Sequence, residues 1–302
     1  MYKLPTLQEL LEAGVHFGHQ VRRGHPRMKP YIYGVRDGVH IINLEESDKF
    51  LKEACEYVYK LGSEGKVLLF VGTKKQARPI IEEAVKEMNA GFLTEKWIGG
   101  FLTNFEEIKK NIKLLKEYKV QKEKGELSKY TKKEQLLLDR KMAKLDKNFK
   151  GVMEMLVLPD AIFVVDAVSD NIAIREAIRL GIKTVAIADS NCNVSEIDYP
   201  IPGNDDAIKS ITILVEAVAK AYGEGKKEAG NIAAKLAKKA EQDAAKEAAR
   251  AAQIKVTEEK IPEELKVSKA PVGAADDELT VEVEAAEEMV EKEAVKDAEK
   301  IV

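Results

Sequence analysis

The residues best suited to metal or proton chemistry are gathered near the N-terminus. All four histidines of the chain lie within a window of 25 residues: His16, His19, His25 and His40. His16 and His19 are three residues apart, a spacing that lets two imidazoles share one metal ion on a helix. A zinc site needs four ligands, and neither Cys55 nor Cys192 is close to these histidines in sequence. The pattern therefore favours no metal site here, and we expect two free thiols.

The same window is rich in cations and aromatic rings. It holds five basic and three aromatic residues: Arg22, Arg23, Arg27, Lys29, Arg36, Phe17, Tyr31 and Tyr33. Cations can neutralise phosphates while rings can stack on bases, which is the combination that an RNA-contacting loop needs. We predict RNA contact at this loop. The alternative is a loop that packs on its own domain.

A second candidate anion site lies at residues 72–78, where a predicted strand turns into a helix. A helix N-terminus presents free amides and the positive end of the helix dipole, which favours a phosphate. Lys74, Lys75 and Arg78 strengthen that prediction. The spacing matches neither a GxxxxGK loop nor GxGxxG, so an RNA phosphate is favoured over a nucleotide.

Four aspartates support an alternative enzymatic function. Asp166, Asp189, Asp205 and Asp206 lie at predicted strand or helix ends, and ligands of open α/β sheets bind outside the carboxyl ends of the strands. A phosphate- or nucleotide-handling enzyme would use Asp166 and Asp189 there, as acid and base or with Mg²⁺. We favour structural roles, in which Asp189 ends a strand while Asp205 and Asp206 complement a helix dipole. We therefore predict no catalytic residues and no cofactor.

The single tryptophan, Trp97, precedes two glycines and then Asn104. Two glycines after a large ring allow the backbone to approach another molecule closely. The partner of this segment is either protein or RNA, and we include Trp97 and Asn104 among the predicted RNA-contacting residues.

These residues require a scaffold, and the sequence predicts an α/β sheet. Continuous apolar runs at 67–71, 161–165 and 184–188 are typical of strands that are buried on both faces. Helical patterns at 74–89, 170–180 and from Asn204 alternate with them, which predicts a doubly wound parallel sheet. A capping box at Thr6 begins a short helix, residues 14–38 read as an ordered loop, and 39–43 as a short strand.

Residues 105–150 interrupt this alternation. Phe105, Ile108, Ile112 and Leu115 are spaced as heptad core positions, as are Leu138, Met142, Leu145 and Phe149. Thr131 begins a second capping box, so we predict an antiparallel coiled-coil hairpin. The segment holds 15 Lys and Arg against 8 Asp and Glu, a net charge of +7. We predict phosphate contact through four lysines: Lys109, Lys110, Lys132 and Lys133. The alternative is an ordinary solvated helix pair.

Composition divides the chain into three parts. Residues 226–302 hold 14 Lys and Arg against 19 Asp and Glu, so a net charge of −3 for the whole chain leaves +2 for residues 1–225. We expect an α/β domain over 1–104 and 151–222, the hairpin over 105–150, and a largely disordered acidic tail over 223–302. No run of residues predicts a membrane helix or a signal peptide, so we expect a cytoplasmic protein.

Several segments together resemble a known family. Eight of them, in this order, are similar to segments of the bacterial small-subunit ribosomal protein two family: 14–19 (GVHFGH), 26–32 (PRMKPYI), 40–44 (HIINL), 70–74 (FVGTK), 97–100 (WIGG), 102–104 (LTN), 158–161 (LPDA) and 201–207 (IPGNDDA). The resemblance runs from about Leu4 to Tyr222. Many members have Trp-Asn where this chain has Gly24-His25, so stacking is not carried over to those two positions.

The resemblance implies a fold and a function. It implies a flavodoxin-like parallel sheet with an inserted coiled-coil hairpin, in a structural protein rather than an enzyme. It implies a place between head and body of the small ribosomal subunit, contact with small-subunit rRNA and neighbouring ribosomal proteins, and a role in docking the large mRNA-binding ribosomal protein one. The family's basic loop maps onto Arg22, Arg23, Arg27 and Lys29, and its Gly-Thr-Lys turn onto residues 72–74. No membrane and no small-molecule substrate are expected as partners.

Overall fold

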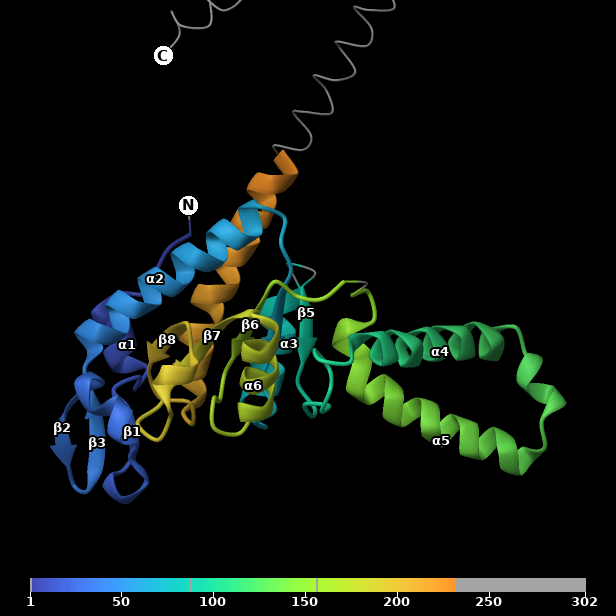
Figure 1. The fold of residues 1–302 in the computed structure, drawn as a ribbon, viewed down its shortest axis with the longest axis horizontal. Helices are drawn as coiled ribbons and strands as arrows, with labels where there is room; N and C mark the ends of the chain where they lie inside the picture. The colour runs from blue at the N-terminus through green and yellow to red at the C-terminus, as the bar shows by residue number, and fades with distance from the viewer. Residues whose placement is uncertain (1, 87, 89, 156, 232–302) are drawn as a thin grey trace, which may run out of the picture. The chain divides into compact units, whose positions relative to one another are not determined.

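A five-stranded parallel sheet forms the centre of the protein. The computed structural model describes residues 2–86, 88, 90–155 and 157–231. Within them the strands lie in the order β5-β4-β6-β7-β8 (Figure 1), with these bounds: β4 (Leu68–Val71), β5 (Gly91–Leu93), β6 (Ala161–Val164), β7 (Lys183–Ala188) and β8 (Tyr199–Pro202). The three predicted strands are confirmed as β4, β6 and β7, and the architecture is consistent with a flavodoxin-like fold.

Helices cover both faces of this sheet, because successive side chains of a strand point to opposite sides. Phe70 and Phe163 face one core cluster, which is covered by α2 (Leu44–Ser63), α3 (Ala77–Lys86) and a last helix over residues 208–231. Val71 and Ile162 face the other cluster, which is covered by α6 (Asn171–Leu180) and the root of the hairpin. Gly181 ends α6 in the left-handed conformation at φ 70°, where a side chain would be strained.

The N-terminal region differs from the prediction. The helix at the Thr6 capping box is confirmed as α1 (Leu7–Glu12). The predicted loop at 14–38 instead contains two strands, and with the next they form an antiparallel sheet in the order β1-β3-β2: β1 (Phe17–Gln20), β2 (Ile32–Arg36) and β3 (Val39–Ile42). Asp37 and Gly38 have φ 50° and 75°, so they form the two-residue turn for which Asp-Gly is a strong signal. The periodicity of apolar residues did not predict this sheet because its strands are short and of mixed polarity.

Two helices form the segment inserted between β5 and β6. They are α4 (Phe105–Glu123) and α5 (Lys132–Phe149), joined by η3 (Glu126–Lys129), and they run side by side away from the sheet (Figure 1). The capping box at Thr131 is confirmed. Buried side chains line the contact, including Ile112, Leu115 and Met142. The Tyr118 hydroxyl donates to Asp139 at 2.6 Å across it. The assignment of the pair as a coiled coil stays a prediction.

The last helix continues beyond the boundary predicted at residue 223, through residue 231. A Cβ on Gly62 would lie 2.6 Å from the Tyr222 carbonyl oxygen, and one on Gly225 would overlap the Tyr59 carbonyl. These glycines let α2 and the last helix come into backbone contact, and the Tyr59 hydroxyl donates to Glu228. Among the described residues, no helix is both long and apolar enough to cross a bilayer. The rest of the predicted tail lies outside the described residues.

Candidate RNA-binding surface

Four exposed cations lie on the two short helices between β1 and β2, η1 (Val21–Arg23) and η2 (Pro26–Tyr31): Arg22, Arg23, Arg27 and Lys29. The backbone beneath them is anchored. Met28 is fully buried, and the His25 amide donates to the Ser190 carbonyl at 2.8 Å. The loop therefore packs on its own domain through its backbone and Met28, while its four charged side chains point to solvent. We call these four residues with their loop the basic loop.

The remaining cation of this region lies at the end of β2. Arg36 is exposed, and its Nε is 3.8 Å from the Asp37 carboxylate. An exposed pair at that distance contributes about 0–1 kcal/mol and is screened by salt. Arg36 therefore remains available to a phosphate.

The turn at residues 72–78 has a different character from the one predicted. The Lys74 ammonium lies 2.9, 2.8 and 2.8 Å from Asp166, Asp205 and Asp206. Although partial burial opposes it, the charge and hydrogen bonds of Asp205 and its neighbours raise the pKa of Lys74. Three carboxylates around this ammonium disfavour a phosphate, so Lys74 does not fit the predicted role. The sequence could not show this because the partners lie far along the chain.

The other residues of the turn differ in whether their side chains are bonded within the protein. The Thr73 hydroxyl donates to Asp170 at 2.9 Å. Arg78 donates to the Glu95 carboxylate at 2.9 Å and to the Glu95 carbonyl at 3.1 Å, so its guanidinium is engaged within the protein. Lys75 is exposed and is the cation of this turn that still suits a phosphate contact.

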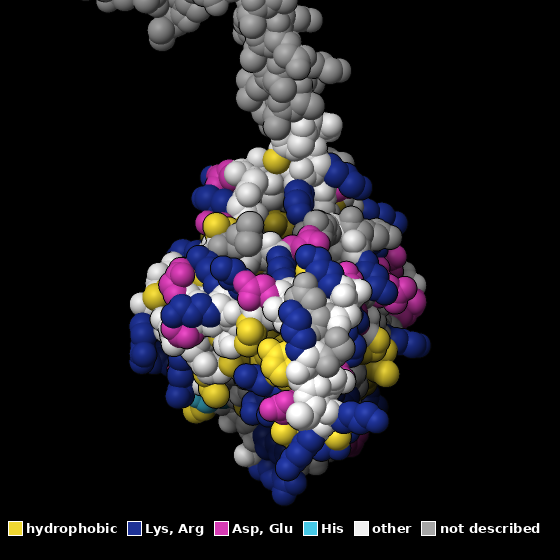
Figure 2. All heavy atoms as spheres, turned by 90° about the vertical axis from the view of Figure 1, so that its right-hand side faces the viewer, with side chains coloured by type: hydrophobic (Ala, Val, Ile, Leu, Met, Phe, Trp, Pro, Cys, Tyr) yellow, Lys and Arg dark blue, Asp and Glu magenta, His cyan; other side chains and the backbone are white. Residues whose placement is uncertain are grey.

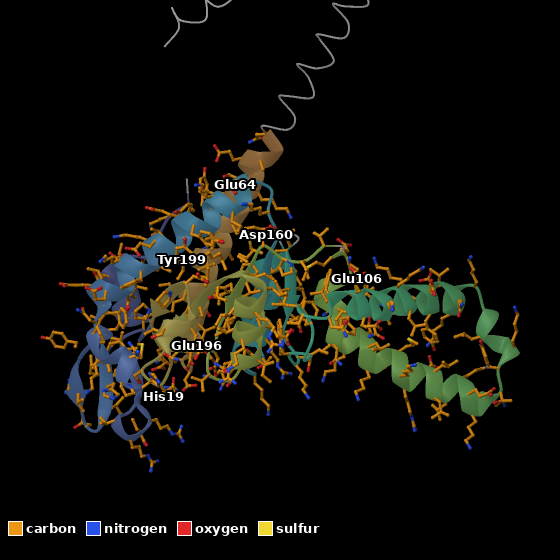
Figure 3. The ribbon with its side chains drawn as sticks, viewed as in Figure 1. His19, Glu64, Glu106, Asp160, Glu196 and Tyr199 are labelled. Atoms are coloured by element: carbon orange, nitrogen blue, oxygen red, sulfur yellow. The ribbon has the colours of Figure 1, made fainter. Side chains whose placement is uncertain are left out.

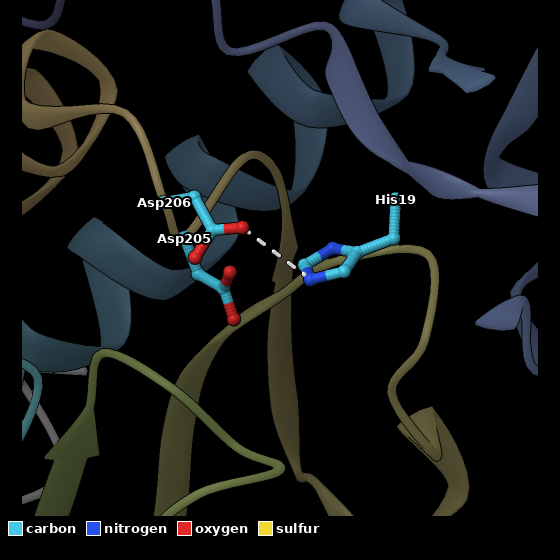
Figure 4. Close-up of side chains that lie close together, drawn as sticks. All are labelled: His19, Asp205 and Asp206. Atoms are coloured by element: carbon cyan, nitrogen blue, oxygen red, sulfur yellow. Dashed lines mark ion pairs between the residues drawn. The ribbon is translucent and has the colours of Figure 1, made fainter.

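His19 joins the small N-terminal sheet to the edge of the large one. Its Nδ1 lies 2.9 Å from Asp189. Its Nε2 lies 3.4 Å from Asp206, and Figure 4 shows this second pair. Its amide also donates to the Ser190 hydroxyl at 2.7 Å. Figure 3 shows His19 at one end of the sheet, where β7 ends, and Asp160 at the other, where β6 begins. The imidazole thus holds β1 against the carboxyl ends of the strands.

The aspartates at this edge have structural partners. Asp166 accepts from the Val168 and Ser169 amides, at 2.9 and 2.8 Å, and from the Ser169 hydroxyl. His19, Asp205 and Asp206 offer atoms within 4.8 Å of one another, close enough for one cation. Lys74 already supplies a positive charge to both of these aspartates. The arrangement is a network of ion pairs and hydrogen bonds that joins loops to the sheet, with more carboxylates than cations.

This network predicts a pH dependence of stability. Hydrogen bonding to Asp189 raises the pKa of His19 above its ordinary 6.5, so the stabilisation is complete below pH 6.5 and is lost as pH rises through the raised value. Burial, with Asp166 and Asp189, raises the pKa of Asp205 to about 7, and its ionisation lowers stability in the same direction. We expect the free energy of unfolding to be lower at about pH 8.5 than at about pH 5.5.

Urea denaturation at both pH values measures this difference. His19→Gln keeps a side chain that can hydrogen-bond but cannot become charged. Its free energy of unfolding should therefore depend less on pH. An unchanged slope in His19→Gln would show that this imidazole does not carry the effect.

Trp97 and Asn104 occupy different environments. The Trp97 side chain is only 6% exposed, and its Nε1 donates to the carboxylate of Glu176, on α6, at 3.1 Å. Its ring cannot stack on an RNA base, so its close partner is protein. Asn104 is exposed at the start of α4 without a side-chain capping bond, and it remains available. The sequence offered no signal for Glu176, since a single Glu on a helix reads as a solvated residue.

The hairpin lysines also separate into two groups. Lys109 and Lys110 pair with Glu106 and Glu107, three residues earlier, at 2.9 and 2.6 Å. Lys132 and Lys133 are exposed at the start of α5. Figure 2 shows the side of the molecule from which the hairpin projects, where Lys and Arg are spread over the surface with acidic side chains among them. Lys132 and Lys133 are the better phosphate candidates.

Known proteins are similar to this chain over most of its length. The model of the ribosomal protein S2 family matches residues 10–225. A protein of Helicobacter hepaticus is 46% identical over 223 residues, which cover 74% of this chain and 84% of that protein. One of Nitratiruptor sp. is 47% identical over 221 residues, covering 73% and 83%, and one of Wolinella succinogenes is 46% identical over 226 residues, covering 75% and 83%.

All three relatives are named small ribosomal subunit protein uS2. They are named for a component of the ribosome and not for an enzyme, so the alternative of a nucleotide-handling enzyme loses its support. The matched residues include the basic loop, the sheet and the hairpin. The chain belongs to the ribosomal protein S2 family.

Proposed function

We propose that this chain is a structural constituent of the small ribosomal subunit and binds small-subunit rRNA through the basic loop. The observation that carries the proposal is the contrast between an anchored backbone and exposed guanidinium groups. The His25 amide is held by Ser190, while Arg22, Arg23 and Arg27 are exposed. A loop of this kind loses little entropy on binding because it is already ordered.

The hairpin supplies a second RNA contact. Lys132 and Lys133 begin α5, at the end of the helix pair that is far from the sheet. Asn104, just before α4, and Lys75, in the sheet domain, are further candidate contacts. Contacts of this kind neutralise phosphates and set position without reading sequence. Two separated contacts, on loop and hairpin, suit a protein that bridges the head and body of the subunit in the cytoplasmic ribosome.

A hollow on the N-terminal region suits a protein partner. It has a volume of about 360 Å³ and is lined by Leu7, Leu11, Tyr33 and Leu44 with Glu45. The Tyr33 side chain is 81% exposed and that of Leu11 is 52% exposed. Exposed apolar surface of this kind marks protein interfaces, and the Glu45 carboxylate would repel a phosphate. We propose that it docks an apolar segment of the large mRNA-binding ribosomal protein one.

Replacing Leu11 and Tyr33 together with serine should weaken that docking by at least roughly thirtyfold, because buried aromatic anchors contribute 2 kcal/mol or more at interfaces. Both residues are exposed, so the free energy of unfolding should change little. The affinity for purified ribosomal protein one, measured by biolayer interferometry, tests this. Ile172→Ser, at an exposed residue of α6, is the control, and equal affinity of the double variant and the control would reject this surface.

Sedimentation tests the function as a whole. Tagged protein in a cell lysate is separated on a sucrose gradient at increasing salt. We expect it to travel with small subunits and complete ribosomes and to leave them only at high salt, because phosphate contacts weaken with a log–log slope of about −0.7 to −0.9 per contact. Protein that stays at the top of the gradient at physiological salt would reject a ribosomal role.

A further inference from the structure

Glu176 is a buried carboxylate at the junction between the sheet and the hairpin. It belongs to α6, its residue is 8% exposed, and it accepts five hydrogen bonds. Its Oε1 accepts from Trp97 Nε1 at 3.1 Å and from the Gly100 amide at 2.8 Å. Its Oε2 accepts from the Leu102 amide at 3.0 Å and from the amide and hydroxyl of Thr103, both at 3.3 Å.

These donors all come from one segment, and α4 begins two residues after it. Burial disfavours the charged form of Glu176, yet the hydrogen bonds from Trp97, Gly100, Thr103 and Leu102 outweigh it and lower its pKa. Among the described residues, the groups that stabilise this charge are four N–H groups and the Thr103 hydroxyl. Gly100 has φ 85°, a left-handed conformation that turns its amide towards the carboxylate and that other residues rarely adopt.

Apolar contacts extend the connection into the hairpin. The rings of Trp97 and Phe101 have centroids 5.3 Å apart, and those of Phe101 and Phe105 are 6.0 Å apart. Phe105 is the first residue of α4. A segment held by five hydrogen bonds to Glu176 thus leads, through rings in tilted and edge-on contact, to the first turn of the helix.

The ion pairs between hairpin and body are weaker than this set of hydrogen bonds. Lys147 pairs with Glu95 at 3.0 Å and Lys150 pairs with Glu82 at 3.4 Å, and both lysines are more than 60% exposed. Exposed pairs contribute about 0–1 kcal/mol each. On the return side, Gly151 packs against Phe92 of β5. Phe105 and Ile108 of α4 are also buried in the core cluster, which holds the root of the hairpin, while Glu176 supplies the hydrogen bonds that fix the direction of the segment before α4.

We infer that Glu176 is a positioning residue for the hairpin. Its carboxylate sets the direction in which α4 leaves the sheet domain, and so holds Lys132 and Lys133 at a constant distance from the basic loop. The consequence for RNA rests on the proposed function. Two contacts on one RNA strengthen each other only when their geometry allows both to bind at once.

Distance measurement between two spin labels tests the inference. Labels are placed at cysteines introduced at Lys133, on the hairpin, and Lys209, on the body, both of which are exposed, whereas Cys55 and Cys192 are buried. Glu176→Gln retains the shape but presents an NH₂ group to N–H donors. We expect a narrow distance distribution in the parent and a broadened, shifted one in Glu176→Gln.

Asp198→Asn is the matched control. Asp198 accepts from the Thr184 amide at 3.0 Å and pairs with Lys183 at 2.6 Å, far from the hairpin, so its loss should leave the distribution narrow. Trp97→Phe and Thr103→Ala remove single donors and should broaden it to a lesser degree, which keeps the test open if Glu176→Gln does not fold. A folded Glu176→Gln protein, or both single-donor variants, with the parent distribution would overturn the inference.

Affinity for small-subunit rRNA, measured on the unlabelled proteins, separates the two proposals. We expect Glu176→Gln to lose roughly tenfold or more in affinity, since avidity of linked contacts is worth about 10²–10⁴ when geometry permits both. A broadened distribution with unchanged affinity would leave Glu176 as the positioning residue and reject RNA contact by the hairpin.

Discussion

Replacing Lys74 with methionine is expected to lower the free energy of unfolding by about 3 to 5 kcal/mol, the usual cost of removing one partner from a buried ion pair. The Lys74 ammonium is within 2.9 Å of Asp166, Asp205 and Asp206. Asp166 and Asp205 are 3% and 1% exposed, and above pH 7 Asp205 is ionised, since its pKa is raised to about 7. Without Lys74 the two charges would then face each other with little solvent, so urea denaturation at about pH 8.5 measures the loss.

Two further variants define the cause. Lys74→Met combined with Asp205→Asn removes one of the stranded charges and should recover part of the lost stability, giving a coupling energy in a double-mutant cycle. Lys183→Met removes a lysine that is 55% exposed and paired with Asp198, and should change the free energy of unfolding little, because solvent screens an exposed pair. A similar small loss in Lys74→Met would mean that solvent already screens the cluster.

Replacing Arg22, Arg23 and Arg27 together with alanine is expected to reduce the affinity for small-subunit rRNA by about 10³-fold, at roughly 1.5 kcal/mol for each hydrogen bond to a charged group. The log–log salt slope should also fall in magnitude by about 2 to 3, because each of the three lost phosphate contacts contributes about 0.7 to 0.9. The loop backbone is anchored by Met28 and by the His25 amide, so the variant should fold normally. Filter binding across a salt series measures affinity and slope together.

A matched loss of charge elsewhere is the control. Lys52, Lys60 and Lys220 are exposed on α2 and the last helix, and replacing them with alanine removes the same three positive charges. This variant should keep most of the affinity and should still enter small subunits. Equal effects of the two triple variants would mean that net charge matters and the basic loop does not.

The three central strands of the main sheet, the helix pair and the basic loop could be predicted from the sequence because each has a local signal. Strands β4, β6 and β7 are short, continuous apolar runs, which a parallel sheet covered on both faces requires. The helix pair is marked by periodic apolar residues and by the Thr131 capping box, whose two bonds join residues only three apart. The exposed cations of the basic loop are marked by composition, since guanidinium groups are rarely buried without a partner.

The state of the individual charged residues was decided by the tertiary structure alone. Lys74 and Lys75 are neighbours of the same type, yet Lys74 meets carboxylates that lie 92 to 132 positions later, while Lys75 is exposed. Trp97 is buried because Glu176, 79 positions away, accepts from its ring nitrogen. A sequence pattern determines which face of an element is apolar, but the partner of a polar group depends on which elements are neighbours in space. The sequence by itself therefore determined the central strands, the helix pair and the family, and the folded structure decided which cations remain free for the proposed RNA contacts.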